Sequence, residues 1–257
     1  MRPDSAPDAA VARASRRAAG ERAPALIYRL ASPNYFYDLT GRALPWLAAA
    51  TALLFLIGLP WALAFAPRDY QQGDSFRILY IHVPAAAFSM GVYVAMAVTA
   101  AIGLIWRIKL AAVISRHCAP VGAAFTFLAL VTGSLWGKPM WGTYWVWDAR
   151  LTSELILLFL YLGYLGLYEA FEERESGSRA AAILALVGVV NIPIIHYSVE
   201  WWHTLHQGAT VFKLDRPSIA PEMLWPLLVM LAAYGLLAVT AVLARARNEV
   251  LERRLET

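Results

Sequence analysis

The chain has little of what holds a small soluble or secreted protein together. Cys118 is its single cysteine, which excludes an internal disulfide framework. Charged residues make up only 16% of the 257 positions, too few to cover a soluble domain of this size. There is no Cys-x-x-Cys-His motif for covalent heme attachment, and no Gly-x-x-x-x-Gly-Lys-Ser/Thr loop for ATP hydrolysis by that route.

Apolar residues are abundant instead, at 60% of the chain, and charge is missing from stretches of about 20 residues. A helix of that length crosses the hydrocarbon of a bilayer. We therefore predict an all-α membrane protein, a single bundle of six transmembrane helices. The predicted spans are 44–66, 84–106, 120–136, 151–171, 180–197 and 225–244. Pro193 lies inside the fifth span and should kink or end it.

The membrane domain is predicted to cover 44–245, between an N-terminal tail (1–43) and a short C-terminal tail (246–257). The N-terminus lacks the apolar core of a secretory signal peptide. Residues 1–23 read as disordered, and 24–43, which mix aromatic and basic side chains, read as an interfacial segment.

Basic residues indicate the orientation. Sixteen of the 22 Lys and Arg residues lie before the first span, after the last span and in the connections 107–117 and 172–179, so the positive-inside rule places both termini in the cytoplasm. The net charge of +4 is then explained by juxtamembrane residues that meet anionic lipid, and nucleic acid is not a predicted partner. Eight of ten Trp and four of five His fall on the opposite, outer side.

The densest aromatic segment, 136–148, joins the third and fourth spans. Its glycines and proline predict that it is not a membrane helix. Flat aromatic faces beside glycines suit a platform for a flat ligand, whereas any single Trp at this depth would be read as an interfacial anchor. The platform residues are Trp136, Trp141, Tyr144, Trp145, Trp147 and Asp148.

Histidines lie at the same predicted depth on either side of this segment. A neutral imidazole is a common axial ligand of heme iron, and two of them can hold a porphyrin from both faces. His203 and His206 are three residues apart and would also suit zinc on a helix, but no carboxylate and thiolate set accompanies them. Asp148 is expected either to orient Arg150 or a Trp N–H, or to cap the fourth span.

The pattern Trp-Gly-x₄-Gly-x₂-Trp-x-Trp-Asp at 136–148 resembles the tryptophan-rich signature of membrane heme-handling proteins of cytochrome c maturation. Within that group the chain is similar to the heme exporter protein C (CcmC) family, and the likeness covers about residues 40–245. Supporting stretches are Tyr70-Gln71-Gln72-Gly73, His82-Val83-Pro84, Asp148-Ala149-Arg150-Leu151 and Leu205-His206-Gln207.

This resemblance implies that His82 and His206 are axial ligands of a transient, non-covalent heme b, with His196, Trp201 and Trp202 as supporting residues. The propionates need cations, for which Arg77, Lys138 and Arg150 are the candidates. It also implies delivery of heme to the periplasmic heme chaperone CcmE, without catalysis by this chain. The implied partners are an ABC ATPase subunit with its membrane partner, a small single-span membrane protein and membrane lipid, all at the bacterial inner membrane.

Three other functions stay open from the sequence. A heme permease fits six helices, but few ionisable residues could line a path, Glu154 being the clearest. An electron-carrying cytochrome b usually binds heme between helices, whereas these histidines lie at the edge of the spans. An assembly scaffold would bind no heme.

Overall fold

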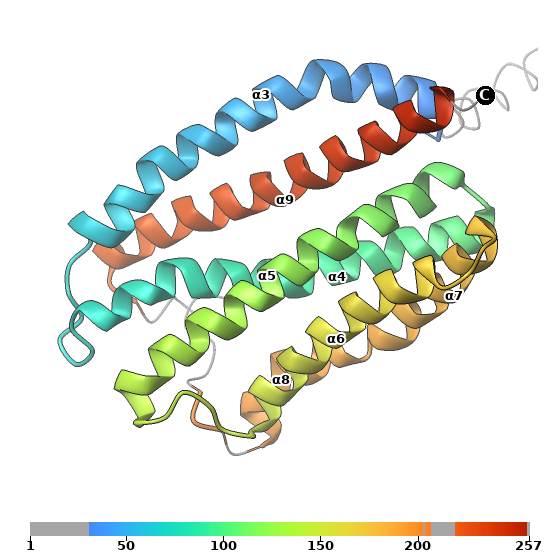
Figure 1. Ribbon diagram of the computed structural model, residues 1–257. Coiled ribbons are helices and arrows are strands. Elements are labelled where there is room, and N and C mark those ends of the chain that lie inside the picture. The colour runs from blue at the N-terminus through green and yellow to red at the C-terminus, as the bar shows by residue number, and fades with distance from the viewer. Residues whose placement is uncertain (1–30, 203, 207–218, 256–257) are drawn as a thin grey trace, which may run out of the picture.

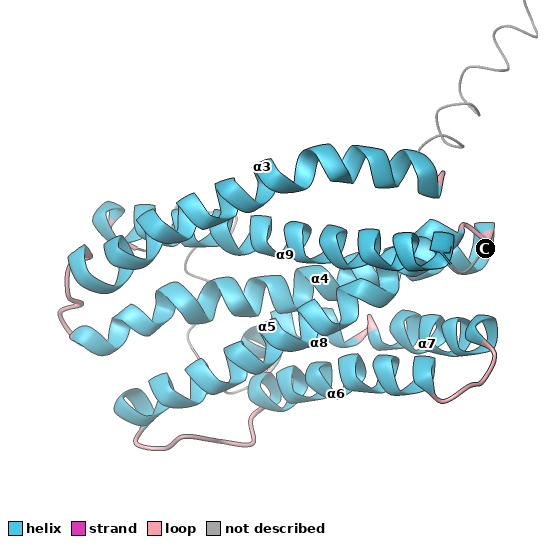
Figure 2. Ribbon diagram, turned by 45° about the horizontal axis from the view of Figure 1, so that its top comes forward, coloured by secondary structure: helices cyan, strands magenta, loops and turns pink. Residues whose placement is uncertain are grey.

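The computed structural model describes residues 31–202, 204–206 and 219–255, and this part of the chain is helical with short connections and no strand (Figures 1 and 2). The elements are α3 (Pro33–Pro60), a π-helical turn (Trp61–Phe65), a 3-10 turn (Asp74–Ile78), α4 (Leu79–Trp106), α5 (Lys109–Trp141), α6 (Ala149–Glu169), α7 (Arg174–Gly188), α8 (Asn191–Trp201) and α9 (Pro221–Leu255). Six helical segments are long and apolar enough to cross a membrane, with α7 and α8 counting as one. The predicted all-α, six-span fold is confirmed.

Most helices extend beyond the predicted spans, because hydropathy detects only the part that lies in hydrocarbon. Pro33 occupies the first turn of α3, where a missing N–H costs nothing, and the helix runs on without a break. Residues 33–43 are therefore the first turns of the first span, while 1–30 lie outside the described residues. The fifth span is interrupted between Gly188 and Asn191, just before Pro193, as predicted.

The prediction that 136–148 is not part of a membrane helix is wrong for its first half, because α5, one of the six candidate spans, continues to Trp141. Pro139 lies inside the helix without ending it, although its missing N–H removes one intrahelical hydrogen bond. The helix ends at Gly142, which adopts a positive φ of 78° and donates its N–H to the carbonyl of Lys138 at 3.1 Å. Only 142–148 form a loop.

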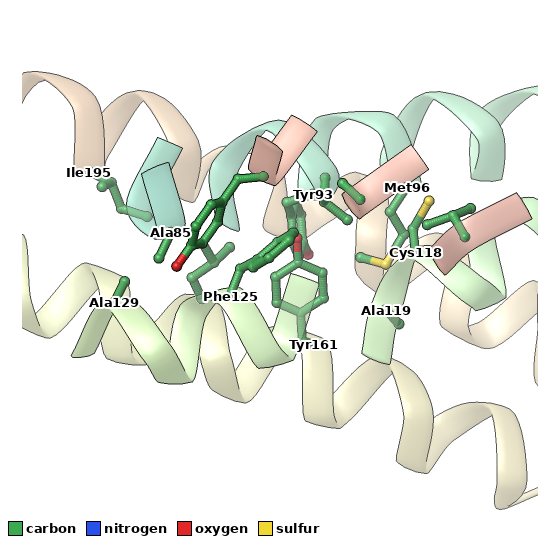
Figure 3. Packing of buried hydrophobic residues seen from close by; sticks show 14 of the residues in the cluster. Ala85, Tyr93, Met96, Cys118, Ala119, Phe125, Ala129, Tyr161 and Ile195 are labelled. Carbon is green, nitrogen blue, oxygen red and sulfur yellow. The ribbon is translucent and has the colours of Figure 1, made fainter. Parts of the chain in front are cut away.

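Large side chains fill the middle of the bundle. The phenol ring of Tyr161 on α6 packs edge-on against Tyr93 on α4, with ring centroids 5.0 Å apart, and both are fully buried (Figure 3). The rings of Phe125 on α5 and Tyr234 on α9 also pack together, with centroids 5.6 Å apart. These contacts join α4, α5, α6 and α9 and fix the relative positions of the elements that carry the site.

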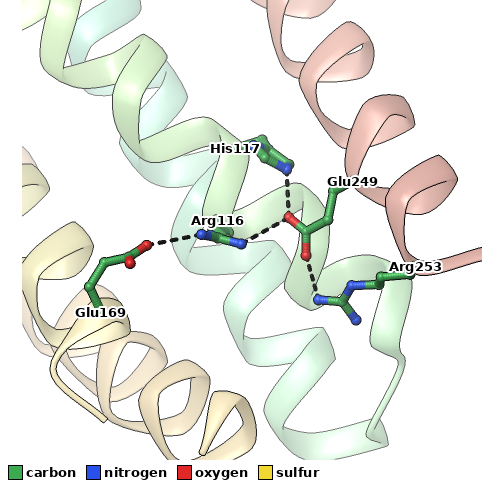
Figure 4. Close-up of polar contacts among 5 residues, drawn as sticks. All are labelled: Arg116, His117, Glu169, Glu249 and Arg253. Atoms are coloured by element: carbon green, nitrogen blue, oxygen red, sulfur yellow. Dashed lines mark hydrogen bonds and ion pairs between the residues drawn. The ribbon is translucent and has the colours of Figure 1, made fainter. Parts of the chain in front are cut away.

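The start of α3 and the end of α9 lie at one end of the bundle, with the α4–α5 and α6–α7 connections (Figure 1). Glu249 is buried at this end and accepts from Arg116, His117 and Arg253, while Arg116 also pairs with Glu169 (Figure 4). His82 and the 142–148 loop lie at the opposite end.

Candidate functional site

His82 lies in the first turn of α4, with its ring against α5. Its Nδ1 is 3.0 Å from the carbonyl oxygen of Ala129 and 3.1 Å from Oγ1 of Thr132. A carbonyl only accepts, so Nδ1 carries the proton and donates it. In a neutral ring, Nε2 then keeps its lone pair, and among the described residues it has no hydrogen-bond partner. This is the tautomer and orientation that a metal-binding imidazole requires.

Gly133 on α5 makes room for this ring. A Cβ at Gly133 would lie 2.9 Å from Cε1 of His82, a distance that real contacts essentially never show. The absence of a side chain at 133 therefore sets how closely His82 approaches α5. Sequence reasoning missed this residue, because a glycine inside an apolar helix carries no local signal of what it faces.

His206 is held by Asp148. The carboxylate uses one oxygen, Oδ1, to accept from the N–H of Leu151 at 2.8 Å and so caps α6. Its other oxygen, Oδ2, lies 3.2 Å from Nδ1 of His206. The structure thus bears out the capping role for Asp148 and adds a histidine partner that was not expected from the sequence.

Burial lowers the pKa of His206 from its ordinary value, and the nearby positive charge of Arg150 lowers it further, against the opposing effect of Asp148. The lowered pKa favours the neutral ring, which is the form that a metal-binding imidazole requires. Asp148 fixes the proton on Nδ1 and directs Nε2 away from the carboxylate, the arrangement of a carboxylate–histidine–metal triad.

Both histidines line one cavity of about 40 Å³, which lies between α4, α5, α6 and α8. Arg150 and Glu154, from the first two turns of α6, line it too, beside apolar side chains such as Ile195. The structure therefore brings together two imidazoles from distant parts of the chain. The cavity is far smaller than the roughly 300–1,000 Å³ of a typical small-molecule site.

The aromatic residues of 136–148 divide into two groups. Trp136 meets His82 edge-on at 5.8 Å, and Trp141 meets His206 edge-on at 4.7 Å. Trp145 and Trp147 instead contact each other at 5.4 Å. Trp147, 76% exposed, and Tyr144 face outward. The first pair packs against the two histidine rings, and the second group forms a partly exposed aromatic surface.

Of the three predicted propionate contacts, only Arg150 lines the cavity. Arg77 is engaged elsewhere, because its guanidinium donates to the carbonyls of Leu63 and Ala66 and pairs with Asp74. Lys138 donates to the carbonyl of Gly142 and lies over the ring of Tyr144. These two cations stabilise the ends of neighbouring helices.

The predicted supporting residues lie apart from the cavity. His196, Tyr197, Trp201 and Trp202 are exposed at the end of α8, and each ring contacts the next. The neighbouring Ile195 faces the cavity in their place. His203, considered above for zinc, is outside the described residues, and no cluster of three metal-binding side chains occurs among the described ones.

Gln72 is a further residue that the sequence did not single out. Its Oε1 accepts from the indole N–H of Trp136 at 3.0 Å, and its backbone N–H donates to Oδ1 of Asp69 at 2.8 Å. The loop between α3 and α4 thereby fixes the tryptophan that contacts His82. The signal available was the Tyr70-Gln71-Gln72-Gly73 stretch, which pointed to a family but not to a contact.

Fold and site together define a multi-pass helical membrane protein that orients two imidazoles at one end of its bundle, beside a tryptophan-rich surface. The family model of heme exporter protein C matches residues 26–257, and the chain belongs to this family. Relatives include heme exporter protein C of Escherichia coli K12, 56% identical over 225 residues (88% of this chain and 91% of the relative). Heme exporter protein C of Bradyrhizobium diazoefficiens is 54% identical over 228 residues (89% of this chain and 86% of the relative). That of Rhodobacter capsulatus is 41% identical over 232 residues (90% of this chain and 96% of the relative).

Proposed function

We propose that this protein binds heme as a transient cargo, with His82 and His206 as the axial ligands of its iron, and presents it at the outer face of the bacterial inner membrane. The observation that carries the proposal is the placement of both imidazoles on one cavity, each with Nδ1 hydrogen-bonded and Nε2 unpartnered among the described residues. The relatives' name, heme exporter protein C, supports heme as the ligand.

The donor set suits heme, but the enclosed volume does not yet accommodate a porphyrin. A cavity of about 40 Å³ holds a few water molecules. We infer that the two imidazoles are farther apart in the loaded protein than in this structure. Nδ1 of His82 contacts two groups on α5, and His82 itself lies in a helix. His206 lies outside a helix, and its ring has one hydrogen-bond partner among the described residues, Asp148. We therefore infer that His206 is the ligand that moves.

The exposed tryptophans suggest the route of delivery. Trp147, with Trp145 behind it, offers an apolar surface next to the cavity, on which a flat ring system can stack. We propose that the periplasmic heme chaperone CcmE collects heme there. ATP hydrolysis would be supplied by an ABC ATPase with its membrane subunit, together with a small single-span protein.

The ligand assignment is tested by titrating the purified full chain with hemin and recording the Soret band. His82→Ala and His206→Ala should each weaken binding by at least tenfold and shift the band, since iron loses an axial nitrogen. His117→Ala, at the opposite end of the bundle, is the matched control and should leave the spectrum unchanged. Unaltered spectra for both His82→Ala and His206→Ala would refute the assignment.

A further inference from the structure

Glu154 is a buried carboxylate for which the proposed function has no use. It lies on α6 within a membrane span and is only 8% exposed. Its Oε1 accepts from Oγ of Ser89 on α4 at 2.8 Å, and the phenol of Tyr161 donates to the backbone carbonyl of Ser89 at 2.7 Å. An ionisable residue at such a position is expensive in lipid, and this cost usually indicates a function.

Arg150 lies one helical turn before Glu154 on the same face of α6, and both line the cavity of the two histidines. Their charges interact, with a further contribution from Asp148. Yet Arg150 forms no hydrogen bond or ion pair within 4 Å to any other described residue. Its guanidinium is thus a permanent cation, with donors still available to an incoming anion.

The charges of the side chains that line the cavity nearly cancel. Arg150 contributes one positive charge, Glu154 one negative charge on the same wall when its carboxyl is ionised, and the two imidazoles none when neutral. A ligand that brings carboxylates meets a cation whose positive charge is already partly offset by a carboxylate on the same cavity wall. Such a site attracts an anionic ligand less strongly than Arg150 alone would, and therefore lets it leave faster.

We propose that Glu154 is an internal competitor for Arg150, which weakens the hold on the heme carboxylates so that the cargo is released rather than retained. This inference rests on the proposed function and identifies a positioning residue within the same site. Ser89 fixes the carboxylate on the wall of the cavity, and Tyr161 fixes Ser89. Glu154 tunes the residence time of the cargo without touching the iron ligands.

The test compares heme release from the full chain in nanodiscs into an excess of heme-free myoglobin. Glu154→Gln keeps the oxygen that accepts from Ser89 but removes the charge, and it should slow release about tenfold, equivalent to ~1.4 kcal/mol. Arg150→Gln should speed release. In the Arg150→Gln background, Glu154→Gln should not change the rate of heme release, because the guanidinium for which Glu154 and the heme carboxylates compete is absent.

Two controls separate this role from a structural one. Heme dimethyl ester lacks the propionate charges, so its release should be equal for the wild type and for Glu154→Gln. Glu249→Gln removes another buried carboxylate, at the opposite end of the bundle, and should leave release of heme unchanged (Figure 4).

Unchanged or faster release from Glu154→Gln would overturn the inference, as would a slower release that persists without Arg150 or with the ester. These outcomes leave the ligand assignment intact, because it depends on the histidine variants. A wild-type chain that binds no heme would overturn both.

Discussion

The contact between Asp148 and His206 gives the sharpest prediction, because one carboxylate has two separable roles. Its Oδ1 caps α6 and its Oδ2 holds the imidazole. Asp148→Asn keeps a good capping side chain but removes the charge from the histidine partner. Loss of such an outer hydrogen-bond partner typically lowers metal affinity 10–100-fold, or about 1.4–2.7 kcal/mol. We expect the affinity for hemin at pH 8 to fall within that range, with little change in thermal unfolding.

The pH dependence of hemin binding provides a second expected effect of Asp148→Asn. Burial lowers the pKa of His206, so the neutral, ligating ring is present above the ordinary histidine value of about 6.5 and is lost as pH falls through the lowered pKa. Asp148 opposes this lowering. Asp148→Asn should therefore lower the pKa of His206 further and move the acid midpoint, the pH at which the affinity for hemin is halved, to lower pH, even though the affinity at pH 8 is weaker.

The assay is a hemin titration of the full chain followed at the Soret band from pH 4.5 to 8, with thermal unfolding of the heme-free protein measured in parallel. Asp148→Ala is the matched variant that removes both roles, and it should cost a further 0.5–2 kcal/mol or so of stability through the lost cap. Wild-type affinity together with a wild-type acid midpoint in Asp148→Asn would refute the argument.

Three further predictions concern the walls of the site. Gly133→Ala should displace the ring of His82, weaken hemin binding and lower the free energy of unfolding by about 1–3 kcal/mol. Gly91→Ala, with open space around its Cβ, is the control and should leave both hemin binding and stability unchanged. Equal hemin binding by the two variants would contradict the packing argument. Gln72→Leu should lower the stability measured by thermal unfolding by about 0.5–1.5 kcal/mol and shift the tryptophan fluorescence. When Gln72→Leu is made in a Trp136→Phe background, the fluorescence should not change, because the indole that lost its partner is already absent. Trp147→Ala should change stability by about 0.5 kcal/mol or less and yet slow transfer of heme to the chaperone; reduced stability with normal transfer would instead assign Trp147 a structural role.

Much of the architecture could be predicted because it depends on local composition. The uncharged runs fixed the number of spans, and Pro193 marked the break in the fifth, since neither feature needs knowledge of neighbours. Helix ends were predicted less well. Residues 136–141 continue α5 despite Gly137 and Pro139, and hydropathy does not register helix that extends beyond the hydrocarbon.

The residue types of the candidate site also came from the sequence alone: histidines, a tryptophan-rich segment and an arginine after it, all at one predicted depth. Which of them share a cavity was decided by tertiary packing. Arg150 lines it and Arg77 does not, because helix rotation and register determine where a side chain points. The partners Asp148 for His206, Gly133 for His82 and Gln72 for Trp136 each join separate elements, and such a pairing leaves no periodic trace in a single sequence.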